Sequence, residues 1–233
     1  MKRGSQIKSR PRGKREHVKT ARRRKVSSTR WLERQLNDPY VAAARAEGYR
    51  ARSAFKLKEI AERYDLFKGA RVIVDLGSAP GGWCQVVREM SPKARVIAVD
   101  LTAMAPIAGI EFIRGDFLDE KTFQRVMAAS AGGVNVVLSD MANPATGHRA
   151  TDQLKTMALA EAAADFALRA LKPDGAFLAK VLQGGGEREL LATLKGRFAK
   201  VFHVKPPASR QDSRELYVLA QGFRGEGPSA TRT

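Results

Sequence analysis

The chain has 233 residues, of which 43% are hydrophobic, and it carries a formal net charge of +18. This length and composition suit one globular domain with an extension, and no apolar run approaches the length of a membrane span or a signal-peptide core. The single cysteine, Cys84, excludes an intramolecular disulfide and a cysteine-based zinc site. We therefore expect a soluble, cytoplasmic protein.

Positive charge is concentrated at the N-terminus. Residues 1–30 hold thirteen lysines and arginines against one acid, Glu16, whereas residues 31–233 hold 29 against 23. Because residues 1–27 contain almost no large apolar side chain, we predict a disordered basic arm. Such an arm can contact nucleic-acid phosphates and release their counterions. The alternatives are a solubilising tail or a targeting signal, although the apolar stripe of an amphipathic transit peptide is missing.

Three short helices are predicted between the arm and the first strand. Ser28 or Thr29 can cap a helix that starts near Trp31. The Asp-Pro pair at 38–39 has the residue types of an N-cap and a first helical position. Ser53 can cap a third helix, which leads to the α/β part of the chain.

A βαβ unit with a glycine-rich turn follows. Residues 71–76 and 95–100 are apolar, β-branched runs typical of buried parallel strands, and residues 85–90 between them have helical spacing. The turn holds three glycines and a proline, which let the backbone approach a ligand closely. The second strand ends in an acid that can bind ribose hydroxyls.

The glycine spacing favours one class of cofactor. The dinucleotide fingerprint G-x-G-x-x-G seats a pyrophosphate on a helix N-terminus. This chain instead reads Asp75-x-Gly77-x-x-x-Gly81-Gly82. A nucleoside cofactor without phosphates fits this spacing better, so we predict S-adenosylmethionine (SAM). The alternative is a plain strand–turn–helix connection in another α/β domain.

The alternation of strands and helices continues to the C-terminus. Further strands are predicted at 111–116, 134–140, 176–182, 201–205 and 215–221, and further helices at 119–129, 152–171 and 187–198. This pattern predicts a Rossmann-like α/β fold, with a mostly parallel sheet of seven strands and helices on both faces.

Acidic residues end several of these strands. Ligands of doubly wound sheets bind at the carboxyl ends of the strands, where Asp75, Asp100, Asp116 and Asp140 fall. We therefore expect all four around one crevice. Lys180 lies inside an apolar strand, where an unpaired lysine would be costly, so we expect it to face the crevice and pair with an acid. A purely structural ion pair is the alternative.

Six motifs occur in order along the chain. They are SAFKL at 53–57, DLGSAPGGW at 75–83, GDF at 115–117, SDMA at 139–142, KVLQG at 180–184 and SRELY at 213–217. Together they resemble the FtsJ/RrmJ family of SAM-dependent ribose 2′-O-methyltransferases. The resemblance covers about residues 28–224, which we expect to form the methyltransferase domain, followed by a flexible tail at 225–233.

The resemblance implies an activity and a set of site residues. The activity is methyl transfer from SAM to the ribose 2′-hydroxyl of a uridine in 23S ribosomal RNA, within the assembled large ribosomal subunit. The implied catalytic residues are Lys56, Asp140, Lys180 and Glu215. The residues implied to bind SAM are Gly81, Trp83, Asp100, Asp116 and Asp140. We also expect a monomer that uses no metal and contacts no membrane.

Several points stay open at this stage. The family commonly reads D-M-A-P-N where this chain has Asn143-Pro144 after DMA, which leaves the details of that loop open. Lys180 can be a general base or a cation that orients the hydroxyl. The rival functions are a methyltransferase of the same fold that acts on tRNA, and a non-enzymatic RNA-binding factor in ribosome assembly.

Overall fold

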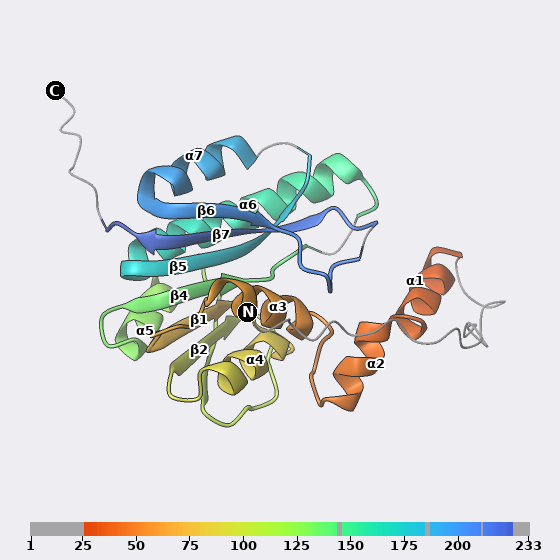
Figure 1. Ribbon diagram of the computed structural model, residues 1–233, viewed down its shortest axis with the longest axis horizontal. Helices are drawn as coiled ribbons and strands as arrows, with labels where there is room; N and C mark the ends of the chain where they lie inside the picture. Colours follow the sequence, from red (N-terminus) through yellow and green to blue (C-terminus); the bar gives the residue numbers. More distant parts are fainter. Residues whose placement is uncertain (1–25, 144–145, 185–186, 211, 226–233) are drawn as a thin grey trace.

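The computed structural model describes residues 26–143, 146–184, 187–210 and 212–225, which surround one seven-stranded sheet (Figure 1). The helices are α1 (Val26–Leu36), α2 (Pro39–Ala46), α3 (Ala54–Tyr64), α4 (Gly82–Met90), α5 (Glu120–Ala129), α6 (Arg149–Ala170) and α7 (Glu187–Arg197). The strands are β1 (Val72–Leu76), β2 (Arg95–Asp100), β3 (Ile110–Arg114), β4 (Val134–Ser139), β5 (Leu171–Leu182), β6 (Phe198–Val204) and β7 (Glu215–Phe223).

The sheet has the strand order β3-β2-β1-β4-β5-β7-β6. Strands β1 to β5 pair in parallel, whereas β7 is antiparallel to both β5 and β6. After β1 the chain adds β2 and β3 on one side of β1, and after β4 it adds β5 on the opposite side of the sheet. The direction in which strands are added therefore reverses between β1 and β4. Doubly wound sheets bind their ligands at this switch point. The predicted α/β fold with a mostly parallel sheet is confirmed.

Helices cover both faces of the sheet. Side chains of α5, α6 and α7 form one buried apolar cluster with the first face, and side chains of α3 and α4 form another with the second. Successive residues of β1 contribute to opposite clusters: Val74 and Leu76 belong to the first cluster, and Ile73 belongs to the second. This alternation follows from the two-residue period of a strand. In Figure 1, α1 and α2 stand out at one side of this body.

The N-terminal helices begin only partly as predicted. Asp38 caps α2, and its Oδ1 accepts a 3.0 Å hydrogen bond from the backbone N–H of Tyr40. Helix α1, however, starts at Val26, so Ser28 and Thr29 lie inside it rather than before it. Serine and threonine inside a helix cost less than about 1 kcal/mol relative to alanine, so they need not mark its start. Most of the predicted arm and of the predicted tail, residues 1–25 and 226–233, lies outside the described residues.

Strand β5 and helix α6 also begin earlier than predicted. The pairing of β4 with β5 shifts in register between Val134 and Val136, and the extra residues include Asp174 with φ of 63°. The Lys172–Gly175 segment, which has the composition of a turn, is therefore accommodated inside the strand as an irregularity. The variant loop at Asn143-Pro144 stays an open point, because residues 144–145 lie outside the described residues.

Candidate active site

Strand register brings the predicted polar side chains to one point. Lys180 of β5 lies opposite Tyr217 of β7, and Leu182 lies opposite Glu215. Because alternate side chains of a strand share a face, Lys180, Tyr217 and Glu215 lie on the same face of the sheet. Asp140 directly follows β4, the parallel neighbour of β5. Helix α3 packs on this same face and carries Lys56.

The four predicted catalytic residues form two ion pairs joined by a tyrosine. Lys56 Nζ lies 2.8 Å from Oε2 of Glu215. Lys180 Nζ lies 3.1 Å from Oδ1 of Asp140 and donates a 2.6 Å hydrogen bond to the backbone carbonyl of Asp140. The Tyr217 hydroxyl donates a 2.7 Å hydrogen bond to the same Oδ1, and Lys56 Nζ lies 5.7 Å from the centre of the Tyr217 ring. The structure thus brings all four residues together.

Charge balance allows this set to be buried. Lys56 and Lys180 are each only 7% exposed, and each lies against a carboxylate, which offsets the cost of taking a charge out of water. Burial raises the pKa of Glu215, but Lys56, Lys180 and Arg52 together outweigh this effect, and the pKa lies below its usual value. Burial, followed by the charge of Asp140, raises the pKa of Tyr217 well above 10.0. Tyr217 therefore stays protonated and can donate to Asp140.

A cavity of about 400 Å³ opens at the carboxyl ends of the strands, and we call it the strand-end cavity. Its polar lining includes Asp100, Asp116 and Asp140. Both oxygens of Asp100 already accept backbone hydrogen bonds, from Ala79 N–H at 2.9 Å and from Thr102 N–H at 2.7 Å. Each carboxylate oxygen has a second lone pair, so Asp100 can still accept bonds from a ligand. The apolar part of the lining includes Val99, Leu101, Phe117, Leu118 and Leu159.

Gly77 is required where β1 meets this cavity. Its φ is +70°, a conformation that side chains disfavour. A Cβ at this position would lie 2.1 Å from Cγ of Met141, which also lines the cavity. The glycine of the D-x-G motif therefore lets the β1 turn and the segment after β4 approach each other closely.

Two residues predicted to bind SAM lie outside the lining of this cavity. Gly81 is the N-cap of α4, with φ of +107°. Trp83 is only 3% exposed; its Nε1–H donates a 2.9 Å hydrogen bond to the Ser53 carbonyl, and its ring packs against Tyr217 at 5.8 Å between centroids. In this structure Trp83 thus packs against the sheet face that carries Tyr217 and Lys180.

Asp75 also lies outside the cavity, contrary to the expectation of four acids around one crevice. It is 1% exposed, and it accepts a hydrogen bond from Sγ of Cys84 on α4 at 3.2 Å. The alternation of β1 directs Asp75 to the same face as Ile73. Burial raises the pKa of Asp75 to about 7, although the hydrogen bond from Cys84 acts to lower it.

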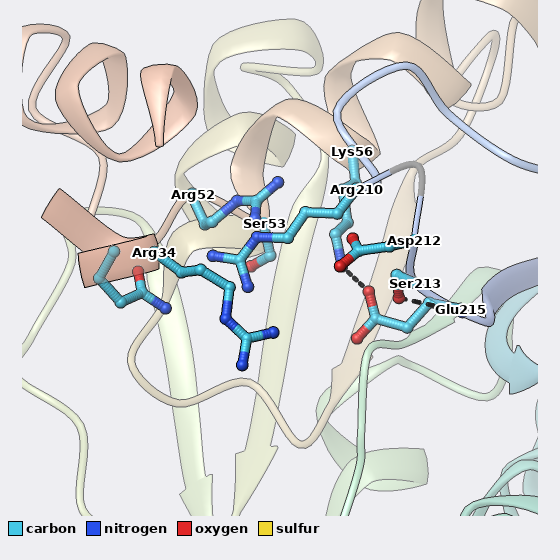
Figure 2. A pocket seen from close by; sticks show the side chains of 9 residues that line it. Arg34, Arg52, Ser53, Lys56, Arg210, Asp212, Ser213 and Glu215 are labelled. Atoms are coloured by element: carbon cyan, nitrogen blue, oxygen red, sulfur yellow. Dashed lines mark hydrogen bonds and ion pairs between the residues drawn. The ribbon is translucent and has the colours of Figure 1, made fainter. Parts of the chain in front are cut away.

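Sequence reasoning missed a second cavity beside the catalytic set. This cavity of about 350 Å³ includes Lys56 and Glu215 in its lining, together with three arginines (Figure 2). The arginines come from α1, from the residues before α3 and from the residues before β7, so no local motif signals their proximity. Tyr217 was also missed as a partner of Asp140, because the bond depends on long-range pairing.

The described residues contain no cluster of three or more histidines, cysteines and acids that could hold a metal ion. Within the same ranges, no helix is long and apolar enough to cross a bilayer.

Comparison with known proteins assigns the family. A model of the FtsJ-like methyltransferases matches residues 49–223, which is most of the chain. The chain belongs to the FtsJ-like methyltransferase family. The predicted family is thus confirmed, and the chain is a methyltransferase.

Relatives of similar length support this assignment. The chain is 57% identical to a protein of Sphingopyxis alaskensis over 91% of this chain and 93% of that one. It is 56% identical to a protein of Bradyrhizobium diazoefficiens over 89% and 93%. Both are named Ribosomal RNA large subunit methyltransferase E. A crystal structure of a ribosomal RNA methyltransferase from Plasmodium falciparum is 28% identical, with a TM-score of 0.69 over 76% of this chain and 100% of that one.

Proposed function

We propose that this protein transfers a methyl group from SAM to the ribose 2′-hydroxyl of a uridine in large-subunit ribosomal RNA. The observation that carries the proposal is the Lys180–Asp140 pair beside the Lys56–Glu215 pair, adjoining the strand-end cavity. The names of relatives at 57% and 56% identity support the substrate class. The assembled large subunit is the form of substrate we propose.

The strand-end cavity fits SAM by size and chemistry. Its volume of about 400 Å³ lies in the range of small-molecule sites. We propose that Asp100 accepts hydrogen bonds from the ribose hydroxyls, and that Leu101 and Leu118 contact the adenine ring. Asp116 and Asp140 supply further acceptors on the polar side of the lining. The predicted contacts of Gly81 and Trp83 with SAM stay part of this proposal, although neither residue is part of the lining of the strand-end cavity.

The protein residues prepare the hydroxyl for methyl transfer. When bound, SAM supplies an activated methyl group on a sulfonium, so no metal is required. Lys180 carries three N–H donors, and two contacts to Asp140 orient its ammonium group. We propose that the remaining position meets the 2′-hydroxyl, whose oxygen would bond to the methyl carbon while the carbon–sulfur bond of the sulfonium breaks and the hydroxyl proton leaves. Lys180 takes that proton if it enters the step as a neutral amine; if it stays an ammonium, it orients the oxygen and the proton passes to solvent.

The basic arm and the domain boundaries belong to this proposal as well. Residues 1–27 would contact RNA phosphates outside the active site, and residues 28–224 would form the catalytic domain, with a tail at 225–233. Because Val26, the first described residue, already lies in α1, a truncation meant to spare the described helices should remove no more than residues 1–25.

Methyl transfer to ribosomal particles tests the proposal. Large subunits from cells that lack this protein are incubated with the protein and with SAM labelled in its methyl group, and the modified ribose is then mapped. We expect label at a uridine 2′-oxygen of the large-subunit RNA. Preferential labelling of tRNA by an order of magnitude would favour the tRNA alternative, and absence of both SAM binding and transfer would favour a non-enzymatic factor.

A further inference from the structure

The loop between β2 and β3 borders the strand-end cavity but has no core of its own. Residues 101–109, all of which the structure describes, contain no helix or strand, and none of them is buried. Leu101 nevertheless lines the cavity, directly after Asp100. A segment with so few buried contacts is held only weakly by its own packing. Contacts from other parts of the chain therefore set the position of this loop.

One arginine supplies three such contacts. Arg50, in the segment between α2 and α3, donates hydrogen bonds from Nη1 to the Ala105 carbonyl at 2.6 Å and to the Pro80 carbonyl at 3.1 Å. Its Nη2 donates a bond to the Pro106 carbonyl at 2.8 Å. Pro80 belongs to the turn between β1 and α4, so one guanidinium group joins that turn to the loop. The rigid, planar fork of charged donors suits this role.

The main chain of Arg50 is itself fixed on α4. The Gln85 side chain accepts a 2.8 Å hydrogen bond from the Arg50 backbone N–H and donates a 2.9 Å bond to the Gly48 carbonyl. On the same helix, Trp83 donates a 2.9 Å bond to the Ser53 carbonyl. The segment is thus anchored on both sides of Arg50, and the guanidinium group extends from a fixed base.

The turn and the loop approach each other closely at Gly81. A Cβ at this position would lie 2.7 Å from Cδ1 of Ile107, 2.8 Å from Sδ of Met104 and 3.1 Å from Nη1 of Arg50. A larger residue would displace these groups. The turn, the loop and the guanidinium group therefore form one packed junction.

The two joined segments carry different parts of the cavity wall. The turn contributes Gly77 and Ala79, and the end of β2 with the start of the loop contributes Asp100 and Leu101. We propose that Arg50 is a positioning residue for cofactor binding, which holds these parts of the wall in the arrangement that binds SAM. The inference rests on the proposed function and deepens it, because Arg50 lies outside the lining of the cavity. A wall that is already ordered avoids the ordering cost of binding.

Titration calorimetry with SAM tests this role on the full chain. Arg50→Gln removes the guanidinium group and with it the three bonds to the carbonyls. We expect affinity about tenfold weaker than that of the wild type, which corresponds to a binding-competent wall in about one molecule in ten. An unchanged affinity would overturn the inference.

Limited proteolysis of the cofactor-free protein gives the second readout. Thermolysin cleaves beside apolar residues, and the loop offers Leu101, Met104 and Ile107. Because cleavage follows the population of the opened chain, the loop of Arg50→Gln should be cut at least about tenfold faster than that of the wild type. Weaker SAM binding without faster cleavage would also overturn the inference, because the effect of Arg50 would then not depend on the loop.

Arg197→Gln is the matched control. Arg197 donates two hydrogen bonds to the Gly225 carbonyl, at 3.3 Å and 3.1 Å, and lies at the end of α7 that leads to the edge strand β6. Its affinity for SAM and its loop cleavage should equal those of the wild type, and losses like those of Arg50→Gln would overturn the inference. Arg50→Lys keeps the charge but loses the Nη2 donor, so it should show the same two changes in weaker form, and it tests the inference even if Arg50→Gln unfolds.

Methyl transfer to large subunits separates this inference from the proposed function. Wild-type protein that binds SAM more tightly than Arg50→Gln but transfers no methyl group would contradict the proposed function and support the inference. In active protein, Arg50→Gln should raise KM for SAM and leave kcat at saturating SAM nearly unchanged, a split that loss of folded protein would not produce. A lower kcat with an unchanged KM would contradict the positioning role.

Discussion

Lys180 Nζ lies 3.1 Å from Oδ1 of Asp140 and donates a hydrogen bond of 2.6 Å to the backbone carbonyl of the same residue. These two contacts fix a nearly buried ammonium group on β5 to the end of the neighbouring strand β4. The group therefore lies at the edge where doubly wound sheets bind ligands. The pair accounts both for a lysine inside an apolar strand and for the chemistry that we propose.

Asp100→Ala should weaken SAM binding. The substitution removes a charged acceptor from the strand-end cavity, and such hydrogen bonds contribute roughly 1.5–3 kcal/mol. It also releases the backbone N–H groups of Ala79 and Thr102. Titration calorimetry measures the affinity, with Asp165→Ala, an exposed acid on α6, as the control. An affinity equal to that of the wild type would remove Asp100 from the cofactor site.

Glu215→Gln should change how stability depends on pH. Burial raises the pKa of Glu215, but Lys56 and other cations outweigh this, and the pKa lies below 4.5. A carboxylate with a lowered pKa stabilises the fold above the unfolded pKa, and this contribution is lost as pH falls through the folded pKa. We therefore expect the wild type to melt at a higher temperature than the variant at pH 7, with the difference shrinking below pH 4.5.

Melting curves over a pH series check this expectation. Glu111→Gln removes the exposed partner of Arg95 and should have little effect at any pH, because exposed ion pairs contribute little. A difference between wild type and Glu215→Gln that stays constant across the series would contradict the link to Lys56.

The fold was largely predictable from local patterns. The apolar runs that became β1, β2 and β4 are short and bounded by glycines or acids, and each strand appears within two residues of its predicted range. The start of β5 was not predictable, because the Lys172–Gly175 segment has turn composition and pairs with β4 only through a shifted register. Secondary structure that depends on a distant partner leaves little local signal.

The site was predictable as a list of residues but not as an arrangement. Motifs name Lys56, Asp140, Lys180 and Glu215, but the bond from Tyr217 to Asp140 depends on the pairing of β5 with β7. The cavity lined by Arg34, Arg52 and Arg210 likewise joins parts of the chain that are remote in sequence. Asp75 shows the converse error, since its position at a strand end indicated a ligand site while the alternation of β1 directs it to α4.

Removal of residues 1–25 should weaken RNA binding and flatten its salt dependence. These residues carry twelve lysines and arginines and one acid, and each phosphate contact that is lost should lower the log–log slope by about 0.7–0.9. The affinity for SAM should not change. An unaltered slope would show that the arm does not bind phosphate, and would favour a role as a tail or a targeting signal.

Lys180→Ala tests the central claim, which is that this lysine acts on the 2′-hydroxyl. Loss of a positioned acid–base group typically lowers the rate by roughly 10²–10⁴. The affinities for SAM and RNA should change much less, because the contact acts mainly in the transition state. Asp140 keeps its hydrogen bond from Tyr217, so the melting temperature should change little. Lys172→Ala, which removes an exposed lysine of the same strand, should alter neither quantity.

The decisive measurement is the single-turnover rate of methyl transfer by Lys180→Ala, expressed per folded molecule and taken together with its melting temperature. We predict a rate at least about 10²-fold below that of the wild type, in a protein that melts near the wild-type temperature. A protein with a much lower melting temperature and a near-normal rate per folded molecule would contradict the account, and would make the Lys180–Asp140 pair purely structural.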